Sequence, residues 1–508
     1  MERLHIKLQR VQTWLFGVPR LRAMVGANVL LGETLRIELP NLARETGRGW
    51  TLAPNNEEYP TADPDDPLGD HDDPASDARD GILARDGGHF EALFANGAMA
   101  FADAAKLLLR SNLPDLHFHV SIDGVPCSKS QVHLSTALPV LAPCEWTGRG
   151  VASVNVRQGT ESHAVSLDVK QRHDAARRTE DGTAVDIASM LSERTKLNVL
   201  NREKQLQELN ELVGDGYLAL IHADGNGVGS GAGKTDGERA KFFHKNRVLL
   251  RRAVKEAIDD ACDNDKAGKN ESPAPLVPLM LGGDDLLLIC RARVALSFVV
   301  KICAELETIQ QDAADFRLTL GLGVVIAKHT VPIHRLHEVA EQLASSAKRR
   351  FRGLVDGDAK RSVVDWAVFR TTSIDAPVEV RRRDWLRGTG DDLRVLSQRP
   401  IDVLGRGLDS LQGLVTAAEM LRHGPRSQFR YLVEQLPRGR ALSELAFQEL
   451  SKEAIDALKK AGVKDKELWR RAGNVWLTAL LDLVEITEIA HLGRYAEHSD
   501  IKREVAHV

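Results

Sequence analysis

Three acidic residues in the second half of the chain have the chemistry to hold divalent metal ions. Asp224 directly follows the apolar run 217–223, and Asp284 with Asp285 follows the apolar run 276–281. Both runs are typical of buried strands, so we expect neighbouring strands to gather the three carboxylates. Two Mg²⁺ or Mn²⁺ ions on such ligands, about 4 Å apart, can activate a hydroxyl and neutralise a triphosphate. We therefore predict that Asp224, Asp284 and Asp285 are metal ligands and catalytic residues; the alternative is a polar hairpin turn.

A glycine-rich loop follows Asp224 and precedes a predicted helix. Its unobstructed backbone N–H groups and the helix dipole favour phosphate binding. Lys348, near the end of the predicted helix 332–352, can reach triphosphate oxygens from the same side. The predicted nucleotide-binding residues are Gly225, Asn226, Gly227, Gly229, Lys234, Gly282, Gly283 and Lys348. Residues 231–235 also resemble a Walker A loop, although Val228 stands where that pattern requires glycine, so a P-loop ATPase is an alternative.

The elements that must position these residues follow one another between residues 214 and 373. Thr235 and Glu238 have the spacing of a capping box, which predicts the start of an amphipathic helix. The complete series is a strand at 217–223, this helix, a hairpin at 276–289, a helix at 294–309, a strand at 317–327, a helix at 332–352 and a strand at 362–369. A βαββαβ order with an added helix and strand predicts a ferredoxin-like palm domain.

Residues 1–150 repeat this plan without the acidic residues. A strand at 4–8, a hairpin around Gly87-Gly88-His89-Phe90, a helix at 98–109 and a strand at 116–122 predict a degenerate first palm domain. Residues 57–80 are acidic and rich in proline, and we expect them to form a mobile surface insertion. Two His-Asp pairs, His71-Asp72 and His173-Asp174, are likewise expected at the surface.

The remaining segments complete an α+β protein with two ferredoxin-like palm domains of the nucleotide-cyclase and polymerase type. Residues 151–213 read as a connecting segment, and the helical spacing of apolar residues in 374–508 predicts an all-α C-terminal domain. Five widely spaced cysteines contain no paired motif, so zinc is not expected; Cys127 and Cys144, with His117, His119 or His133, are the nearest candidates.

Charge and hydropathy narrow the classes of function. The 508 residues include 68 Lys and Arg against 72 Asp and Glu, and the net charge of −4 excludes a strongly basic nucleic-acid coat protein. The N-terminus has no apolar signal core, and the apolar segment at 475–490 is interrupted by acidic residues. We expect a cytoplasmic protein without membrane contact.

Four stretches resemble a known family: Val11-Gln12-Thr13-Trp14-Leu15-Phe16 with Gly26-Ala27-Asn28; Gly87-Gly88-His89-Phe90; Asp224-Gly225-Asn226-Gly227 with Gly282-Gly283-Asp284-Asp285; and Ala347-Lys348 with Val364-Asp365-Trp366. The family is the large palm-polymerase subunit of type III CRISPR-Cas effector complexes. The resemblance implies ATP as substrate and cyclic oligoadenylates as products in antiviral defence. It also implies CRISPR RNA and other effector subunits as partners, with target RNA as activator. The family's HD nuclease domain is not expected here.

The resulting functional prediction is a metal-dependent nucleotidyltransferase that releases pyrophosphate. One alternative is a non-catalytic scaffold subunit of an RNA-guided complex that has kept the palm motif. Another is a stand-alone cyclic-nucleotide synthase outside CRISPR, for which a homo-oligomer is compatible with the sequence.

Overall fold

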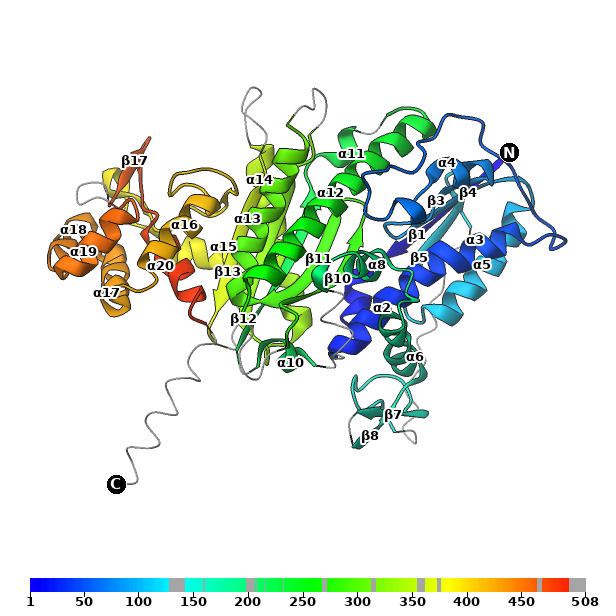
Figure 1. Ribbon diagram of the computed structural model, residues 1–508, viewed down its shortest axis with the longest axis horizontal. Coiled ribbons are helices and arrows are strands. Elements are labelled where there is room, and N and C mark those ends of the chain that lie inside the picture. The colour runs from blue at the N-terminus through cyan, green and yellow to red at the C-terminus, as the bar shows by residue number, and fades with distance from the viewer. Residues whose placement is uncertain are drawn as a thin grey trace.

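The computed structural model describes residues 1–492 apart from 128–141, 159, 198–205, 207, 215, 232, 267–271, 312–316, 354–360, 372–375 and 464–467. The described part is a mixed α+β fold with two large sheets and a mainly helical region. These three regions follow one another along the long axis of the molecule, from the blue sheet through the green sheet to the orange helices (Figure 1). The predicted α+β fold class is confirmed.

The central sheet carries the predicted acidic residues and has the strand order β10-β11-β9-β12-β13-β16. Its strands are β9 (Tyr217–Gly225), β10 (Leu276–Gly282), β11 (Asp285–Arg291), β12 (Leu320–Lys328), β13 (Val363–Phe369) and β16 (Ile401–Asp402). Its helices are α12 (Asp236–Asn264), α13 (Ala292–Ile309) and α14 (Ile333–Arg352). The chain order from β9 to β12 is βαββαβ, as the sequence predicts, and α14 and β13 are the added helix and strand.

Strand β9 lies in the middle of this sheet and contributes to two hydrophobic cores. Ala219, Ile221 and Ala223 belong to a core that also contains α12, α13 and helices of the C-terminal region. Leu218 and Leu220 point to the other face and belong to a core shared with α14 and the N-terminal sheet. Because side chains alternate along a strand, Asp224 lies on the face that looks toward α14 and the N-terminal sheet.

The N-terminal sheet repeats the arrangement of the central one. Its strand order is β2-β4-β1-β5-β6, and β3 also pairs with β4. The elements are β1 (Glu2–Gln9), β2 (Thr51–Leu52), β3 (Ile82–Ala84), β4 (His89–Asn96), β5 (His117–Ile122) and β6 (Val125–Pro126), with helices α1 (Val11–Leu15), α2 (Leu21–Glu33), α3 (Leu39–Arg44) and α5 (Ala98–Asn112). Strand β1 pairs antiparallel with β4 and β5, just as β9 pairs with β11 and β12. The repeated hairpin, helix and strand agree with the sequence prediction.

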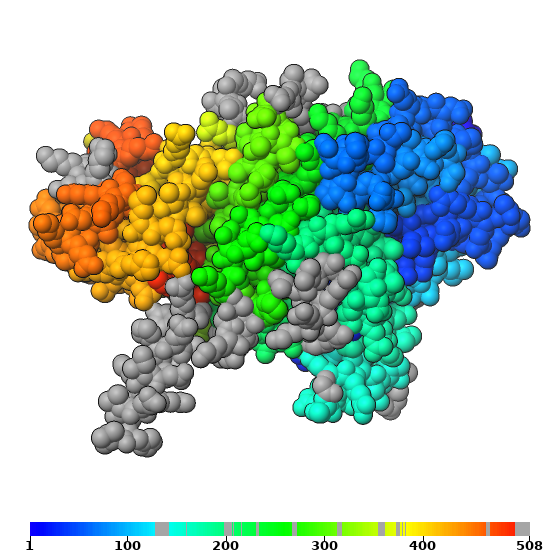
Figure 2. Space-filling model, viewed as in Figure 1, coloured from blue at the N-terminus to red at the C-terminus, as the bar shows by residue number. Residues whose placement is uncertain are grey.

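The acidic segment 57–80 is bound to helix α12, which corrects the expected mobile surface insertion. Nη1 of Arg251 lies 2.7 Å from a carboxylate oxygen of Asp66 and 2.7 Å from one of Asp72. Arg247, one helical turn earlier, contacts both oxygens of Asp72 at 2.6 and 2.7 Å. Asp72 and Asp66 are buried. In Figure 2 the blue surface of the N-terminal half lies directly against green residues of the central region.

The second His-Asp pair also differs from expectation, because His173 is buried in helix α6. The connecting segment contains β7 (Val154–Gln158), β8 (Glu161–Val165), α6 (Leu167–Ala175), α7 (Arg177–Glu180), α8 (Ile187–Glu193) and α10 (Leu209–Val213). Cys127 belongs to the N-terminal core, whereas Cys144 lies in a separate small cluster beside this segment. His133, the third zinc candidate considered with them, lies outside the described residues.

The C-terminal region is mainly helical, but β16 and four further short strands correct the all-α expectation. The helices are α15 (Pro377–Val380), α16 (Leu411–Leu421), α17 (Arg426–Gln435), α18 (Arg440–Gln448), α19 (Lys452–Lys460) and α20 (Leu480–Ile489). The strands β14 (Leu386–Arg387), β15 (Arg394–Val395), β17 (Arg470–Ala472) and β18 (Val475–Leu477) form a separate small sheet. Strands of two or three residues are too short to show an alternating pattern in the sequence.

Within the described chain, no helix has the length and apolar character needed to cross a membrane.

Candidate active site

The three predicted acidic residues converge where β9 meets the β10-β11 hairpin. The pairing of Ala223 with Leu286 places Asp224 opposite Asp285, and Asp284 belongs to the turn that precedes β11. Gly283 in this turn has φ of +62°, a conformation that glycine adopts without the strain of a side chain. One carboxylate oxygen from each of the three residues lies within 4.8 Å of the other two. The predicted cluster therefore exists in the structure.

The three carboxylates of this cluster lie close enough to repel one another. Burial first, and then the nearby Asp224 and Asp284 carboxylates, together raise the pKa of Asp285 to about 8. Burial and Asp224 also raise the pKa of Asp284. Carboxylates that are held together against their mutual repulsion fit a divalent cation, which would bond to oxygens and neutralise the charge. The residues present therefore fit the predicted Mg²⁺ or Mn²⁺ ions.

Lys348 lies at this cluster and forms an ion pair with Asp224. It comes from helix α14, which crosses the sheet over Gly321, the residue paired with Asp224 on β12. A Cβ atom on Gly321 would lie 2.7 Å from Cγ of Lys348. Glycine at this position therefore leaves the space through which the lysine reaches the carboxylate. The structure brings Lys348 to the predicted site, and its contact there is with Asp224.

The glycine-rich loop between β9 and α12 begins against the acidic turn. A Cβ atom on Gly225 would lie 2.6 Å from Oδ2 of Asp284, so a side chain here would collide with the cluster. Asn226 is buried and fixes the loop, since its backbone N–H donates to the Thr319 carbonyl at 2.8 Å and Nδ2 donates to the Thr319 hydroxyl at 3.2 Å. Gly227 has φ of +70°. Residues 228–231 form the short helix α11 (Val228–Gly231), which contains Gly229.

The far end of the loop is occupied by a helix cap. The Thr235 side chain accepts from the backbone N–H of Glu238 at 3.2 Å, which confirms the predicted capping box. Oε2 of Glu238 accepts from the backbone N–H groups of Lys234 and Thr235 at 2.8 and 3.1 Å. These amides are therefore already bonded within the chain, and Lys234 is exposed. Strand β9 is antiparallel to both of its neighbours, whereas a P-loop follows a strand of a parallel sheet, which argues against the P-loop alternative.

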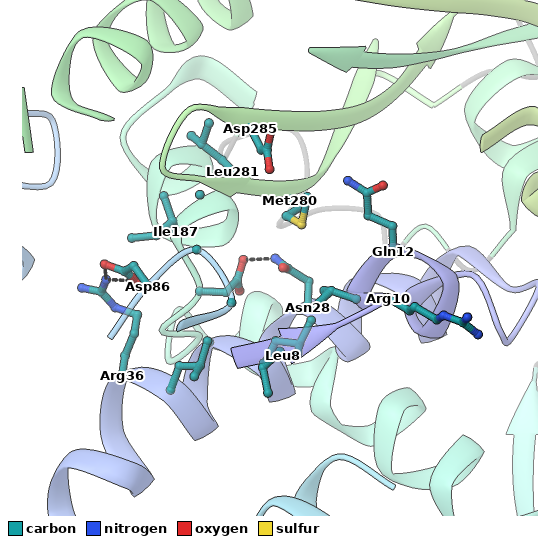
Figure 3. Close-up of a pocket in the computed structure, with 18 of the residues that line it drawn as sticks. Leu8, Arg10, Gln12, Asn28, Arg36, Asp86, Ile187, Met280, Leu281 and Asp285 are labelled. Atoms are coloured by element: carbon teal, nitrogen blue, oxygen red, sulfur yellow. Dashed lines mark hydrogen bonds and ion pairs between the residues drawn. The ribbon is translucent and has the colours of Figure 1, made fainter. Parts of the chain in front are cut away.

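A cavity of about 560 Å³ lies between the acidic hairpin and the N-terminal region (Figure 3). Asp285, Met280 and Leu281 line it from the hairpin, and Gln12, Asn28 and Arg36 line it from the N-terminal side; Arg10 also borders it, with its side chain directed away from the hairpin. The two Gly-Gly turns meet here, because a Cβ atom on Gly282 would lie 3.6 Å from Cα of Gly87. The N-terminal region thus supplies one wall of the cavity.

Polar residues of the N-terminal wall were not singled out as site residues in the sequence. Arg36 is buried and contacts both carboxylate oxygens of Asp86 at 2.7 Å. Asn28 donates to Asp186 of the connecting segment. Asn28 lies in one of the stretches that carry the family resemblance, and this resemblance is the sequence feature that could have indicated a role for it. Nothing in the spacing of Arg36 and Asp86 indicates their pairing.

Comparison with known proteins gives a family match for the central region. Residues 217–354 match the model of the second palm domain of Cas10/Cmr2. The matched residues include β9, the acidic hairpin and α14 with Lys348. No curated protein matches the chain.

Solved structures with a similar arrangement have low sequence identity. A chain of the Csm1-Csm4 cassette in complex with one ATP is 12% identical with a TM-score of 0.37, and the match covers 69% of this chain and 53% of that one. A chain of the cassette in complex with pppApApA is 12% identical with a TM-score of 0.44, covering 96% of this chain and 69% of that one. Csm1 in T. onnurineus is 13% identical with a TM-score of 0.42, covering 91% and 64%. This chain therefore spans about half of the ATP-bound chain and about two thirds of the other two.

Proposed function

We propose that this protein is a metal-dependent nucleotidyltransferase that makes cyclic oligoadenylates from ATP, as the large subunit of a type III CRISPR effector complex. The observation that carries the proposal is the convergence of Asp224, Asp284 and Asp285 within 4.8 Å at the end of β9. The family match to a second palm domain supports it, because the matched residues 217–354 contain all three carboxylates.

The reaction joins two ATP molecules. The 3′-hydroxyl oxygen of one ATP bonds to the α-phosphorus of another, the bond from that phosphorus to the bridging oxygen breaks, and pyrophosphate leaves. The hydroxyl proton passes to water. Mg²⁺ or Mn²⁺ held by Asp224, Asp284 and Asp285 would supply charge neutralisation and activation of the hydroxyl.

The chain's own residues position the reactants. Lys348 places an ammonium group beside Asp224, where it can contact phosphate oxygens. Gly225 lets the loop pack directly against the acidic turn, because a Cβ atom there would lie 2.6 Å from Oδ2 of Asp284. The neighbouring cavity of about 560 Å³ has the size of a small-molecule site, and its N-terminal wall limits how a nucleotide can lie against Asp285.

The proposed partners follow from the family resemblance of the sequence. Other type III subunits and CRISPR RNA would hold the protein in the complex, and target RNA would activate it. The net charge of −4 agrees with RNA contacts that are local rather than spread over the surface.

The test is synthesis of cyclic oligoadenylates by the purified protein, alone and in its RNA-guided complex with target RNA. Each ribonucleoside triphosphate is supplied with Mg²⁺ or Mn²⁺, and the products are resolved by mass spectrometry. A cyclic adenylate that disappears in Asp284→Asn with Asp285→Asn supports the proposal. If product forms only in the complex, the protein is a subunit that needs its partners. If the isolated chain also forms product, the protein is a stand-alone synthase. An assembled, target-activated complex without product would identify the scaffold alternative.

A further inference from the structure

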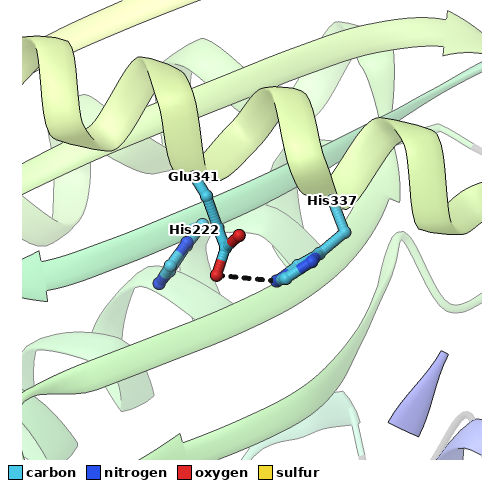
Figure 4. Close-up of side chains that lie close together, drawn as sticks. All are labelled: His222, His337 and Glu341. Carbon is cyan, nitrogen blue, oxygen red and sulfur yellow. Dashed lines mark ion pairs between the residues drawn. The ribbon is translucent and has the colours of Figure 1, made fainter. Parts of the chain in front are cut away.

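A second group of metal-binding side chains lies on the same sheet, outside the acidic cluster. His222 comes from β9, two residues before Asp224, and His337 and Glu341 come from α14. One ligand atom from each of the three lies within 4.8 Å of the other two. Figure 4 shows His337 and Glu341 descending from one face of the helix toward His222 on the strand beneath.

The local structure explains why these three side chains meet. Residues four apart on a helix lie on the same face, which brings His337 and Glu341 together. Gly323 is the residue of β12 paired with His222, and a Cβ atom on it would lie 2.1 Å from the Ala340 carbonyl. The missing side chain lets α14 approach the sheet closely enough for its residues to reach His222.

The separations suit a metal ion. Two ligand atoms that are each about 2.1 Å from a tetrahedral ion lie roughly 3.4 Å apart. Nε2 of His337 and Oε1 of Glu341 are 3.8 Å apart, so only a small contraction is needed. Nε2 of His337 also forms a hydrogen bond of 2.6 Å with the Gln12 side-chain oxygen, so Gln12 must give up this bond when an ion binds to that nitrogen. The ring of Phe16 packs against the same imidazole.

A second observation points to a missing ligand. His222 is 8% exposed, and its Nδ1 atom is buried with no hydrogen-bond partner among the described residues. A buried ring nitrogen without a partner is unfavourable, and coordination of an ion would satisfy it. Two imidazoles and one carboxylate also form a ligand set that selects transition metals over Mg²⁺, because imidazole nitrogen suits Zn²⁺ whereas Mg²⁺ prefers oxygen.

We propose that His222, His337 and Glu341 bind a divalent transition-metal ion of the Zn²⁺ class, separate from the ions of the acidic cluster. Such an ion ties β9 to α14. These two elements carry Asp224 and Lys348, so the ion holds the two residues of the proposed active site in a fixed relative position. The site does not depend on the proposed synthesis of oligoadenylates, because metal binding is measured without ATP.

The experiment measures Zn²⁺ binding to the chelator-stripped full chain by equilibrium dialysis and elemental analysis. Excess Mg²⁺ is present to occupy the acidic cluster. We expect one tightly bound Zn²⁺ and a dissociation constant raised at least about tenfold in Glu341→Gln, His222→Gln and His337→Gln, since even outer-shell changes weaken metal sites that much. Glu341 is 51% exposed, so Glu341→Gln tests the site without disturbing the core.

Matched controls come from the same helix. His334→Gln and Glu338→Gln change exposed residues of the same types and should leave Zn²⁺ binding unchanged. Asp284→Asn with Asp285→Asn, and Cys144→Ser, should also keep the ion, and zinc-edge X-ray absorption should show nitrogen and oxygen ligands without sulfur. Absence of bound Zn²⁺ from the wild-type chain overturns the proposal. So does unchanged binding in Glu341→Gln, or loss of the ion in the acidic or cysteine variants.

Discussion

Lys348 and Asp224 are 124 residues apart in the chain and form an ion pair at the end of β9. The lysine stands beside three carboxylates, so its charge is part of the balance that allows them to remain close. The relationship joins the two elements, β9 and α14, whose relative position decides the geometry of the proposed site.

Replacing Lys348 should impair synthesis more than folding. In Lys348→Met the stem of the side chain remains and the charge is lost, so phosphate oxygens lose a positive partner. We expect kcat/KM for oligoadenylate formation to fall by about 10²-fold, the effect of removing one charge-stabilising group from an active site. Arg349→Met, at the exposed neighbouring position, is the matched control and should retain near wild-type activity. Equal losses in the two variants would contradict a specific role for Lys348.

Asp285 should make the metal-free protein less stable as the pH rises. Folding raises the pKa of this carboxyl from 3.8 to about 8, so the folded state keeps a proton that the unfolded state releases. The stabilisation is complete below pH 4 and is lost progressively between about pH 4 and pH 8. Urea unfolding of the wild type and of Asp285→Asn across this range measures the difference. A constant difference between the two proteins would show that Asp285 has an ordinary pKa.

The same group links metal binding to pH. Because an ion must displace the proton from Asp285, the apparent affinity for Mn²⁺ should rise by about tenfold per pH unit up to about pH 8 and then level off. Calorimetric titration with Mn²⁺ in two buffers of different ionisation enthalpy counts the protons released. Asp285→Asn should release fewer protons than the wild type.

Two glycines of β12 should respond differently to alanine. In Gly321→Ala the new methyl group meets the flexible stem of Lys348, so we expect lower activity with a nearly normal unfolding midpoint. In Gly323→Ala it meets the Ala340 carbonyl at 2.1 Å, and α14 must move away from the sheet. This second variant should lower the free energy of unfolding by roughly 1–3 kcal/mol. Denaturant unfolding together with product analysis separates the two outcomes, and a reversed order would argue against the observed packing of α14.

The acidic segment should contribute strongly to stability. Asp72→Ala leaves Arg247 and Arg251 without a buried carboxylate that both contact, which should cost about 3–5 kcal/mol of unfolding free energy. Asp70→Ala, two residues earlier, is the control, because the Asp70 side chain is 87% exposed and its ion pair with Arg194 spans 3.9 Å. Its effect should be within about 0.5 kcal/mol of zero. Equal free energies of unfolding in the two variants would show that the contacts of Asp72 with helix α12 do not stabilise the protein.

The sequence predicted the features whose cause is local. The capping box at Thr235 and Glu238, the strand that ends at Asp224 and the hairpin around Gly283 all depend on neighbouring residues, and each is found. The acidic residues Asp66 and Asp72 were misinterpreted because their composition is typical of solvated chain. Their partner Arg251 lies 185 and 179 residues away, and no local pattern indicates the pairing.

The histidine site was missed for a similar reason. His222 sits inside an apolar strand and resembles an ordinary core residue, while His337 and Glu341 belong to a helix far along the chain. Only the close passage of α14 over Gly323 brings them together. Asn28 and Arg36 reach the cavity through packing between the N-terminal and central regions, which periodicity within either region does not encode.

Strand β9 packs into two different cores, because its side chains point alternately to the two faces of the sheet. Ile221 is held by α12, α13 and the helices beyond them, while Leu220 is held by α14 and the N-terminal sheet. The position of Asp224 is therefore set jointly by opposite ends of the molecule. Protein interiors are close-packed and transmit strain, so a displacement in the N-terminal sheet or in the C-terminal helices reaches the strand that carries Asp224. Displacement of β9 from either core would therefore move Asp224 relative to the other two carboxylates of the acidic cluster.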